Sequence, residues 1–156
     1  IYVLLQLSLQ LDDADPTDEV IGMICINDPE KETVLVVSEK GKGKRSAVED
    51  YRVTNRGGKG VKTLNITEER GKVVAIKAVT EEEDLMIINK SGIAIRLAVS
   101  ECRVMGRATQ GVRLINLSKK NDVIASVCKV MSSEKEADVE GDKDDETSQP
   151  LNPPTA

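Results

Sequence analysis

The sequence repeats itself with an offset of 51 residues. Shifted by that offset, residues 34–79 lie over residues 85–130 without a gap. Eleven of the 46 aligned positions are identical, where chance would give about three, and such self-similarity is the signature of stacked structural units. A shorter match places residues 20–25 over residues 123–128, so the end of a third copy precedes the other two.

Within each copy, apolar residues come in short β-branched runs separated by Gly, Asn and charged clusters. The runs are residues 20–26, 34–37, 73–79, 85–88 and 123–130. These are strand lengths, and no segment of ten or more residues keeps a helical apolar period, so the sequence predicts an all-β fold. A repeat near 50 residues with about four short strands predicts one four-stranded antiparallel blade per repeat, in a propeller-like array. Two successive small barrels are the alternative.

This interpretation divides the chain into four parts. Residues 1–33 would hold the end of a preceding blade and a linker, residues 34–83 one blade, and residues 84–131 the next. Residues 132–156 are acidic, contain proline and have almost no large apolar residues, so we expect a disordered tail. The chain begins without Met and without a visible signal peptide, and we expect it to be a piece of a longer chain.

The composition excludes several function classes. The chain has no His, Trp or Phe and two Tyr. Without His it cannot build a Ser-His-Asp or Cys-His nucleophile system or a His-ligated metal site. The scarcity of aromatic residues argues against RNA-binding sheets and single-strand binders, which stack bases on such side chains. Cys25, Cys102 and Cys128 have no C-x-x-C spacing, and we expect them to be reduced and buried. A binding module is therefore favoured over an enzyme.

The formal net charge of −5 hides a division along the chain. Residues 1–33 carry one Lys against eight acids, and residues 131–156 carry two Lys against eight acids. Between them, residues 34–130 carry nineteen Lys and Arg against eleven acids, a net charge of +8. A basic middle between acidic ends is typical of a region that binds a polyanion and carries an acidic tail.

Basic residues recur at the same offsets in two loops of each repeat. In the first loop, Gly41 and Gly92 are predicted to hold a hairpin position with positive φ. In the second, glycines let the backbone approach a phosphate and Arg supplies bidentate charge, although Gly111 alone predicts only a tight turn. The candidate phosphate contacts are Lys42, Lys44, Arg45, Arg52, Arg56, Gly57, Gly58, Lys59, Gly60, Lys62, Arg96, Arg103, Arg107 and Arg113.

Two other motifs are weaker. Residues 57–63 look superficially like a nucleotide-binding P-loop, but that motif needs Gly-Lys-Ser/Thr contiguous between a strand and a helix, and Val61 interrupts it. The acidic run at residues 81–84 could suggest a metal site, yet a solvated loop between blades is the better interpretation.

The basic glycine loop inside a β repeat of this length resembles the C-terminal domain of the A subunit of DNA gyrase, a bacterial type IIA topoisomerase. The family's hallmark box reads Gln-Arg-Arg-Gly-Gly-Lys-Gly; here Arg56-Gly57-Gly58-Lys59-Gly60 is kept and Thr54-Asn55 stands before it. Residues 84–112 are also similar to a blade of that family, and the resemblance covers about residues 18–130. Because the family usually has about six blades, we expect this chain to be the C-terminal part of such a disc.

The resemblance implies a β-pinwheel whose basic rim wraps double-stranded DNA through its phosphates, independently of sequence. It implies the rest of the gyrase A subunit, together with the gyrase B subunit, as partners, in the bacterial cytoplasm and without a membrane. ATP and Mg would bind other domains, so this chain alone would need no cofactor and catalyse nothing, while supporting ATP-dependent negative supercoiling by the whole enzyme. The alternatives are a propeller-like protein-interaction module and the C-terminal domain of the topoisomerase IV A subunit.

Deleting residues 132–156 is expected to tighten DNA binding, most at low salt. The tail carries eight acids against two Lys, and its tether gives it a high local concentration at the basic surface, where it competes with DNA. The measurement is duplex affinity of the full and truncated chains. Equal affinity at about 50 mM salt, where phosphate contacts are strong, would make the tail a solubilising extension only.

Overall fold

The computed structural model describes residues 3–4, 20–53, 61–117 and 122–132 of the chain. In these ranges the chain forms strands and two short 3-10 helices, η1 (Val48–Asp50) and η2 (Val99–Glu101). The strands are β1 (Val3–Leu4), β2 (Cys25–Ile26), β3 (Thr33–Ser38), β4 (Lys42–Ala47), β5 (Val73–Val79), β6 (Glu83–Asn89), β7 (Ala94–Ala98), β8 (Val112–Arg113) and β9 (Ile124–Met131). The predicted all-β fold is confirmed, whereas the tail from residue 133 and the loop at residues 54–60 lie outside the described residues.

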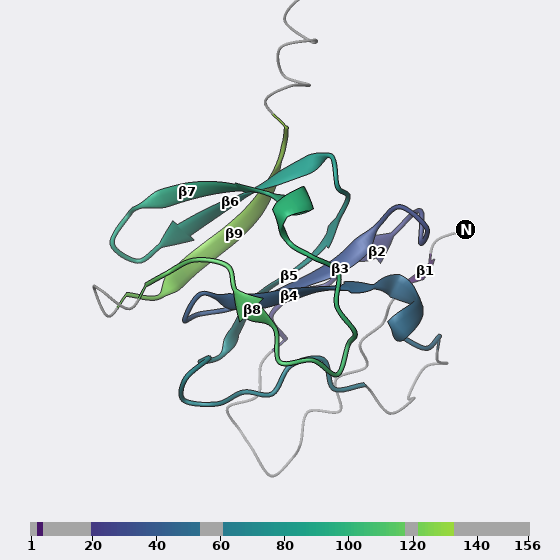
Figure 1. The fold of residues 1–156 in the computed structure, drawn as a ribbon, viewed down its shortest axis with the longest axis horizontal. Coiled ribbons are helices and arrows are strands. Elements are labelled where there is room, and N and C mark those ends of the chain that lie inside the picture. The colour runs from purple at the N-terminus through teal and green to yellow at the C-terminus, as the bar shows by residue number, and fades with distance from the viewer. Residues whose placement is uncertain (1–2, 5–19, 54–60, 118–121, 133–156) are drawn as a thin grey trace, which may run out of the picture.

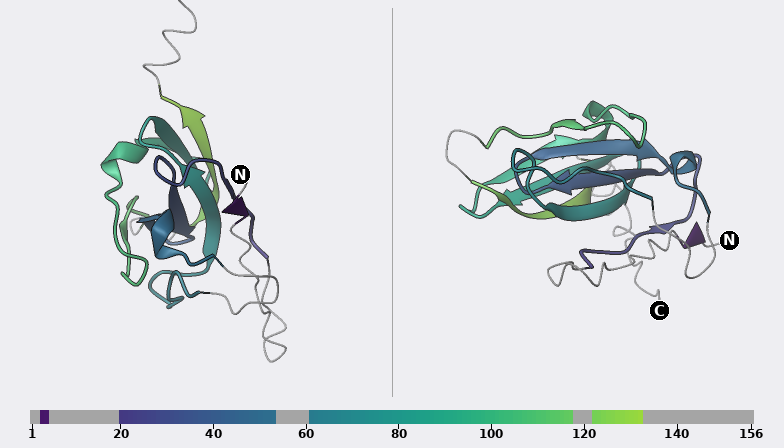
Figure 2. Two further views of the ribbon diagram at one scale, coloured as in Figure 1. Left: turned by 90° about the vertical axis from the view of Figure 1, so that its right-hand side faces the viewer. Right: turned by 90° about the horizontal axis from the view of Figure 1, so that it is seen from below.

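The described strands form three antiparallel sheets (Figure 1). The first sheet has the order β5-β3-β4-β8, the second has the order β7-β6-β9, and β1 pairs with β2. The first and second sheets pack against each other as neighbouring layers, as the turned views of Figure 2 show.

The two repeats build their sheets with the same register. The central strand of each repeat, β3 or β6, pairs with the strand that follows it and with the last strand of its own repeat, β5 or β9. A register shift falls between Val37 and Ser38 in β3 and again, 51 residues later, between Ile88 and Asn89 in β6. The helices η1 and η2 are also 51 residues apart. The repeat found in the sequence is therefore a repeat of structure.

Strand β3 is buried on both faces, which explains its continuous apolar run. Successive side chains of a strand point to opposite faces. Leu35 and Val37 therefore enter a core shared with β5, β6 and β9, while Val34 and Val36 enter a second core. The second core also contains Ile26, Tyr51 and Leu64. Each of these aliphatic side chains stabilises the fold by about 1.5–3 kcal/mol through burial.

The expectation that each repeat completes its own four-stranded sheet is wrong for one strand. β8 belongs by sequence to the second repeat, yet it pairs with β4 of the first, where Gly43 lies opposite Val112. The chain after η2 crosses to the first sheet: Val104 bridges to Arg45, and the Met105 N–H donates to the Arg45 carbonyl at 2.8 Å. A blade is therefore completed by its successor, because the free edge of β4 offers backbone groups that a strand can satisfy.

Three further expectations need correction. Of the apolar run at residues 20–26, only β2 is a strand. The acidic run at residues 81–84 is not a solvated loop throughout, since Glu83 and Asp84 begin β6 and form ion pairs with Lys129 and Arg96. Among the cysteines, Cys102 alone is buried, and burial raises the pKa of its thiol; all three thiols are free.

Gly41 and Gly92 occupy the same hairpin position and have φ of 80° and 83°, as predicted. Their surroundings differ because β8 and the residues after it cover only the first hairpin. A Cβ on Gly41 would lie 2.6 Å from the Ile115 carbonyl oxygen, whereas a Cβ on Gly92 would meet nothing within 4 Å.

This pair allows a matched test of the strand exchange. Gly92→Ala should cost about 1–2 kcal/mol, the penalty for a side chain at positive φ. Gly41→Ala should cost about 1–3 kcal/mol more, because its methyl group meets backbone that must shift. Urea unfolding of both variants measures the difference. Equal losses would mean that the segment after β8 does not cover the first hairpin in solution.

Candidate nucleic-acid interface

Basic side chains from both repeats meet beside β8, where the first sheet ends. Lys42 of β4 lies directly across from Arg113 of β8. Glu69, an exposed side chain, forms an ion pair with Lys42, and this contact lowers the pKa of the Glu69 carboxyl, with smaller contributions from Arg70 and Arg113. We call the five residues Lys42, Lys62, Arg70, Arg107 and Arg113 the basic band.

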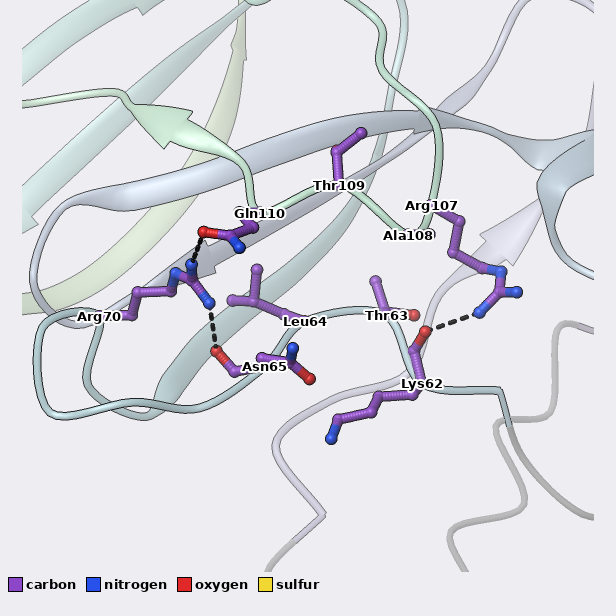
Figure 3. A pocket seen from close by; sticks show the side chains of 9 residues that line it. All are labelled: Lys62, Thr63, Leu64, Asn65, Arg70, Arg107, Ala108, Thr109 and Gln110. Carbon is purple, nitrogen blue, oxygen red and sulfur yellow. Dashed lines mark hydrogen bonds between the residues drawn. The ribbon is translucent and has the colours of Figure 1, made fainter.

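A pocket of about 200 Å³ lies within this band, between residues 62–65 of the first repeat and residues 107–110 of the second (Figure 3). Arg107 and Arg70 stand at opposite ends of it. Arg107 donates from Nη1 to the Lys62 carbonyl at 2.7 Å and from Nε to the Asp50 carbonyl at 3.1 Å. Arg70 donates to the Asn65 carbonyl at 3.1 Å and to Oε1 of Gln110 at 2.5 Å. Two arginines thus join the loops of successive repeats.

Lys44, predicted to contact phosphate, is buried beneath this pocket, with 1% of its surface exposed. Its Nζ donates to the Thr109 carbonyl at 3.0 Å and also to the Arg107 carbonyl. Burial lowers the pKa of this amine, and the neighbouring Arg107 lowers it further. We therefore reassign Lys44 from DNA contact to support of the loop at residues 107–110.

Arg45 is buried as well, with 2% of its surface exposed, and is likewise reassigned. Its Nη1 donates to the carbonyls of Val99 and Cys102, at 3.3 and 3.2 Å, which holds η2 of the second repeat against β4. Its Nε donates to Oγ1 of Thr33, and its Nη2 forms an ion pair with Glu81 at 3.2 Å. Arg45 is a structural link between the repeats.

Arg96 holds the equivalent position in the second repeat, but its surroundings are different. Its side chain is 36% exposed, and its Nε pairs with Oδ2 of Asp84 at 2.7 Å. Its Nη2 donates to the Met131 carbonyl at 2.7 Å. The described residues place no later 3-10 helix over Arg96, so the same repeat position yields a more accessible charge here.

The remaining predicted contacts fall into two groups. Arg52 and Arg103 are exposed just after η1 and η2, at equivalent points of the two repeats. Residues 56–60, which carry Arg56, Gly57, Gly58, Lys59 and Gly60, lie outside the described residues. Of the predicted set, the structure brings Lys42, Lys62, Arg107 and Arg113 together in the basic band.

Arg70 and Gln110 belong to the same pocket, and the sequence analysis missed both as site residues. Recurrence at the repeat offset does not mark them, because Arg70 aligns with Asn121 and Gln110 aligns with Lys59. A signal was nevertheless present in the sequence. Arg70 is a basic residue with a Gly directly after it, and Gly71 has φ of 72°, so residues 70 and 71 mark a turn beside β5.

The described residues offer neither a metal-binding cluster nor a membrane-spanning helix. No group of three or more His, Cys, Asp or Glu side chains there could hold a metal ion. Among the same residues, no helix is long and apolar enough to cross a membrane.

Comparison with known proteins agrees with this arrangement of repeats. The family model for the DNA gyrase C-terminal domain, a beta-propeller, matches residues 32–80 and again residues 83–128. The chain belongs to the DNA gyrase C-terminal domain family. The two matches begin 51 residues apart, at the offset of the internal repeat.

Relatives of this gyrase C-terminal domain include the A subunits of DNA gyrase from two Staphylococcus aureus strains. The protein of strain MRSA252 is 48% identical over 130 residues, which are 83% of this chain and 14% of the relative. The protein of strain NCTC 8325 is 51% identical over 113 residues, 72% of this chain and 13% of the relative. The chain thus spans about a seventh of the length of these relatives.

Two solved structures share the fold. The C-terminal domain of DNA topoisomerase IV superposes with a TM-score of 0.68 at 15% identity, over 83% of this chain and 41% of that one. The DNA gyrase A C-terminal domain superposes with a TM-score of 0.61 at 26% identity, over 70% of this chain and 37% of that one. At 15% identity, the topoisomerase IV match shows a shared fold alone.

Arg45→Met and Arg96→Met should have unequal effects on stability. Removing Arg45 leaves the buried Cys102 carbonyl without this donor, whereas the Val99 carbonyl still accepts from the Cys102 N–H. An unsatisfied buried group costs about 1–3 kcal/mol, so we expect a loss of roughly 2–3 kcal/mol. Arg96 is partly exposed, and its removal should cost about 1 kcal/mol or less. Urea unfolding measures both. Similar losses would show that Arg45 does not link the repeats.

Proposed function

We propose that this chain binds double-stranded DNA through its phosphates. The observation that carries the proposal is the basic band, in which five cations from two repeats gather around β8 and the neighbouring loops. Three carboxylates of the described residues lie near the band: Glu69 pairs with Lys42, Asp50 accepts from the Arg107 backbone N–H, and Asp122 lines a pocket with Lys42 and Arg113. Such an excess of positive charge attracts a polyanion.

Recognition is expected to be independent of base sequence. Most base reading in the major groove is done by an α-helix, and the described residues contain none. Lys and Arg in loops and on an exposed sheet edge are suited to contact phosphates. Such contacts position the protein on the duplex without reading its sequence.

The proposed role in the whole enzyme follows from family membership. As part of the A subunit of a bacterial, cytoplasmic gyrase, the domain would wrap DNA and hand a segment to the cleavage core. The rest of that subunit, together with the gyrase B subunit, would be its partners, and ATP-dependent negative supercoiling would be their joint activity. The chain itself would take no part in cleavage or ATP hydrolysis.

Further phosphate contacts are proposed along the path of the repeats. Arg52, Arg96 and Arg103 carry exposed or partly exposed charge outside the basic band. The loop with Arg56, Gly57, Gly58, Lys59 and Gly60 directly precedes Val61, the residue equivalent to Val112 of β8. By that equivalence, the glycine loop would hold in the first repeat the place that residues 107–111 hold in the second.

The salt dependence of duplex binding tests the proposal. Removing one phosphate contact should lower the slope of log affinity against log salt by about 0.9. Lys62→Ala with Arg113→Ala should therefore lower the slope by nearly two, and binding should weaken equally for unrelated sequences. Both side chains are exposed, so unfolding should shift by no more than about 1 kcal/mol.

Lys31→Ala is the control. Lys31 is an exposed lysine just before β3, at the opposite end of that strand from Lys42 and the basic band. Its removal should therefore leave the salt slope unchanged. The pair Arg56→Ala with Lys59→Ala, measured in the same way, tests the glycine loop. If the wild type and both double variants share one slope, a protein-interaction module becomes the better interpretation.

A further inference from the structure

Among the described residues, the two buried arginines, Arg45 and Arg70, are partnered very differently. Every guanidinium nitrogen of Arg45 has an acceptor, and one of them forms an ion pair. Arg70 is 7% exposed and has two neutral acceptors, while its Nε has no hydrogen-bond partner. Buried arginine is rare unless paired, because removing its charge from water is costly. Arg70 therefore lacks an anionic partner among the described residues.

The surroundings of Arg70 are also short of negative charge. Lys62 and Arg107 line the same pocket, and the buried Lys44 lies close enough to Arg70 and Arg107 for both to lower the pKa of its amine. Asp50 accepts from the backbone N–H of Arg107. Glu69 lies near enough to Arg70 for that charge to lower the pKa of its carboxyl, but it is exposed and forms its ion pair with Lys42. Lys62, Arg70 and Arg107 thus line the pocket, and no carboxylate of the described residues is among its lining side chains.

The pocket is large enough for a small anion. At about 200 Å³ it has room for one phosphate group and several waters, given that a water occupies about 30 Å³ in the liquid. Its walls come from both repeats, and Leu64 and Thr63 lie between the two arginines (Figure 3). Arg70 holds Gln110 of the second repeat, so an anion at Arg70 would also bind at the junction of the repeats.

We infer that this pocket binds a single phosphate group, with Arg70 as its principal charged donor. The inference rests on the proposed function, because we expect the phosphate to belong to the DNA backbone. Free inorganic phosphate would present the same chemistry. The second repeat has Asn121 at the position equivalent to Arg70. The pocket therefore does not recur in each repeat, in contrast to the basic loops.

The direct test follows the arginine Nε–H signals of the full chain by ¹⁵N–¹H NMR. Titration with inorganic phosphate, and separately with a short duplex, should shift the Arg70 signal in a saturable manner. The Arg45 signal is the internal control and should not move, since its Nε already donates to Thr33. An Arg70 signal that responds to neither phosphate nor duplex overturns the inference.

Variants provide the second readout. Phosphate should raise the thermal unfolding midpoint of the wild type and of Lys31→Gln, and this rise should be absent in Arg70→Gln. With DNA, Arg70→Gln should lower the salt slope by about 0.9. If Arg70→Gln does not fold, the wild-type NMR titration still decides.

The outcomes separate the inference from the proposed function. Salt-dependent duplex binding with a silent Arg70 signal refutes the pocket and leaves DNA binding intact. A response of Arg70 to inorganic phosphate without duplex binding supports the pocket, names free phosphate as its source and refutes the proposed function. Displacement of phosphate by duplex supports both.

Discussion

Strand β4 provides three of the polar contacts that hold one repeat against the next. The guanidinium of Arg45 binds carbonyls at η2, the amine of Lys44 binds carbonyls of the loop at residues 107–110, and the strand's free edge pairs with β8. The two side chains give donors to backbone carbonyls of irregular segments, and the pairing with β8 satisfies backbone groups along the edge of β4. The position of every residue in the basic band depends on this junction, because the band consists of side chains from both repeats.

Burying two cations in adjacent positions of a strand is costly, and the geometry shows how the cost is offset. Arg45 distributes its charge over three carbonyl or hydroxyl oxygens and one carboxylate. Lys44 is bound by carbonyls alone, and burial lowers the pKa of its amine accordingly. A hydrophobic residue at either place could fill the space but could not bind the carbonyls, so the junction would lose its specific geometry.

The same junction explains why repeated charge was an ambiguous signal. Arg45 and Arg96 recur at one offset, and the sequence alone suggested a common ligand. The structure shows a different reason for recurrence: a blade completed by its successor uses an arginine at this point to hold the successor's 3-10 helix. Lys44 also binds the following repeat, yet it has no basic counterpart in the second repeat, where Ile95 holds the equivalent position. Exposed residues such as Lys62 and Arg113 remain candidates for phosphate contact, whereas the burial of Arg45 argues against that role for it.

The sequence by itself determined the all-β class, the repeat offset, the strands β3, β5, β6 and β9, and the positive φ of Gly41 and Gly92. Those features depend on local rules, namely apolar periodicity and the conformational freedom of glycine, and they are written in neighbouring residues. Only the tertiary structure decided that β8 joins the preceding sheet, that Lys44 and Arg45 are interior, and that Arg70 lies in a pocket with Arg107. These depend on contacts between residues 37 to 71 positions apart, and the free energy of such contacts comes from burial that no local pattern records.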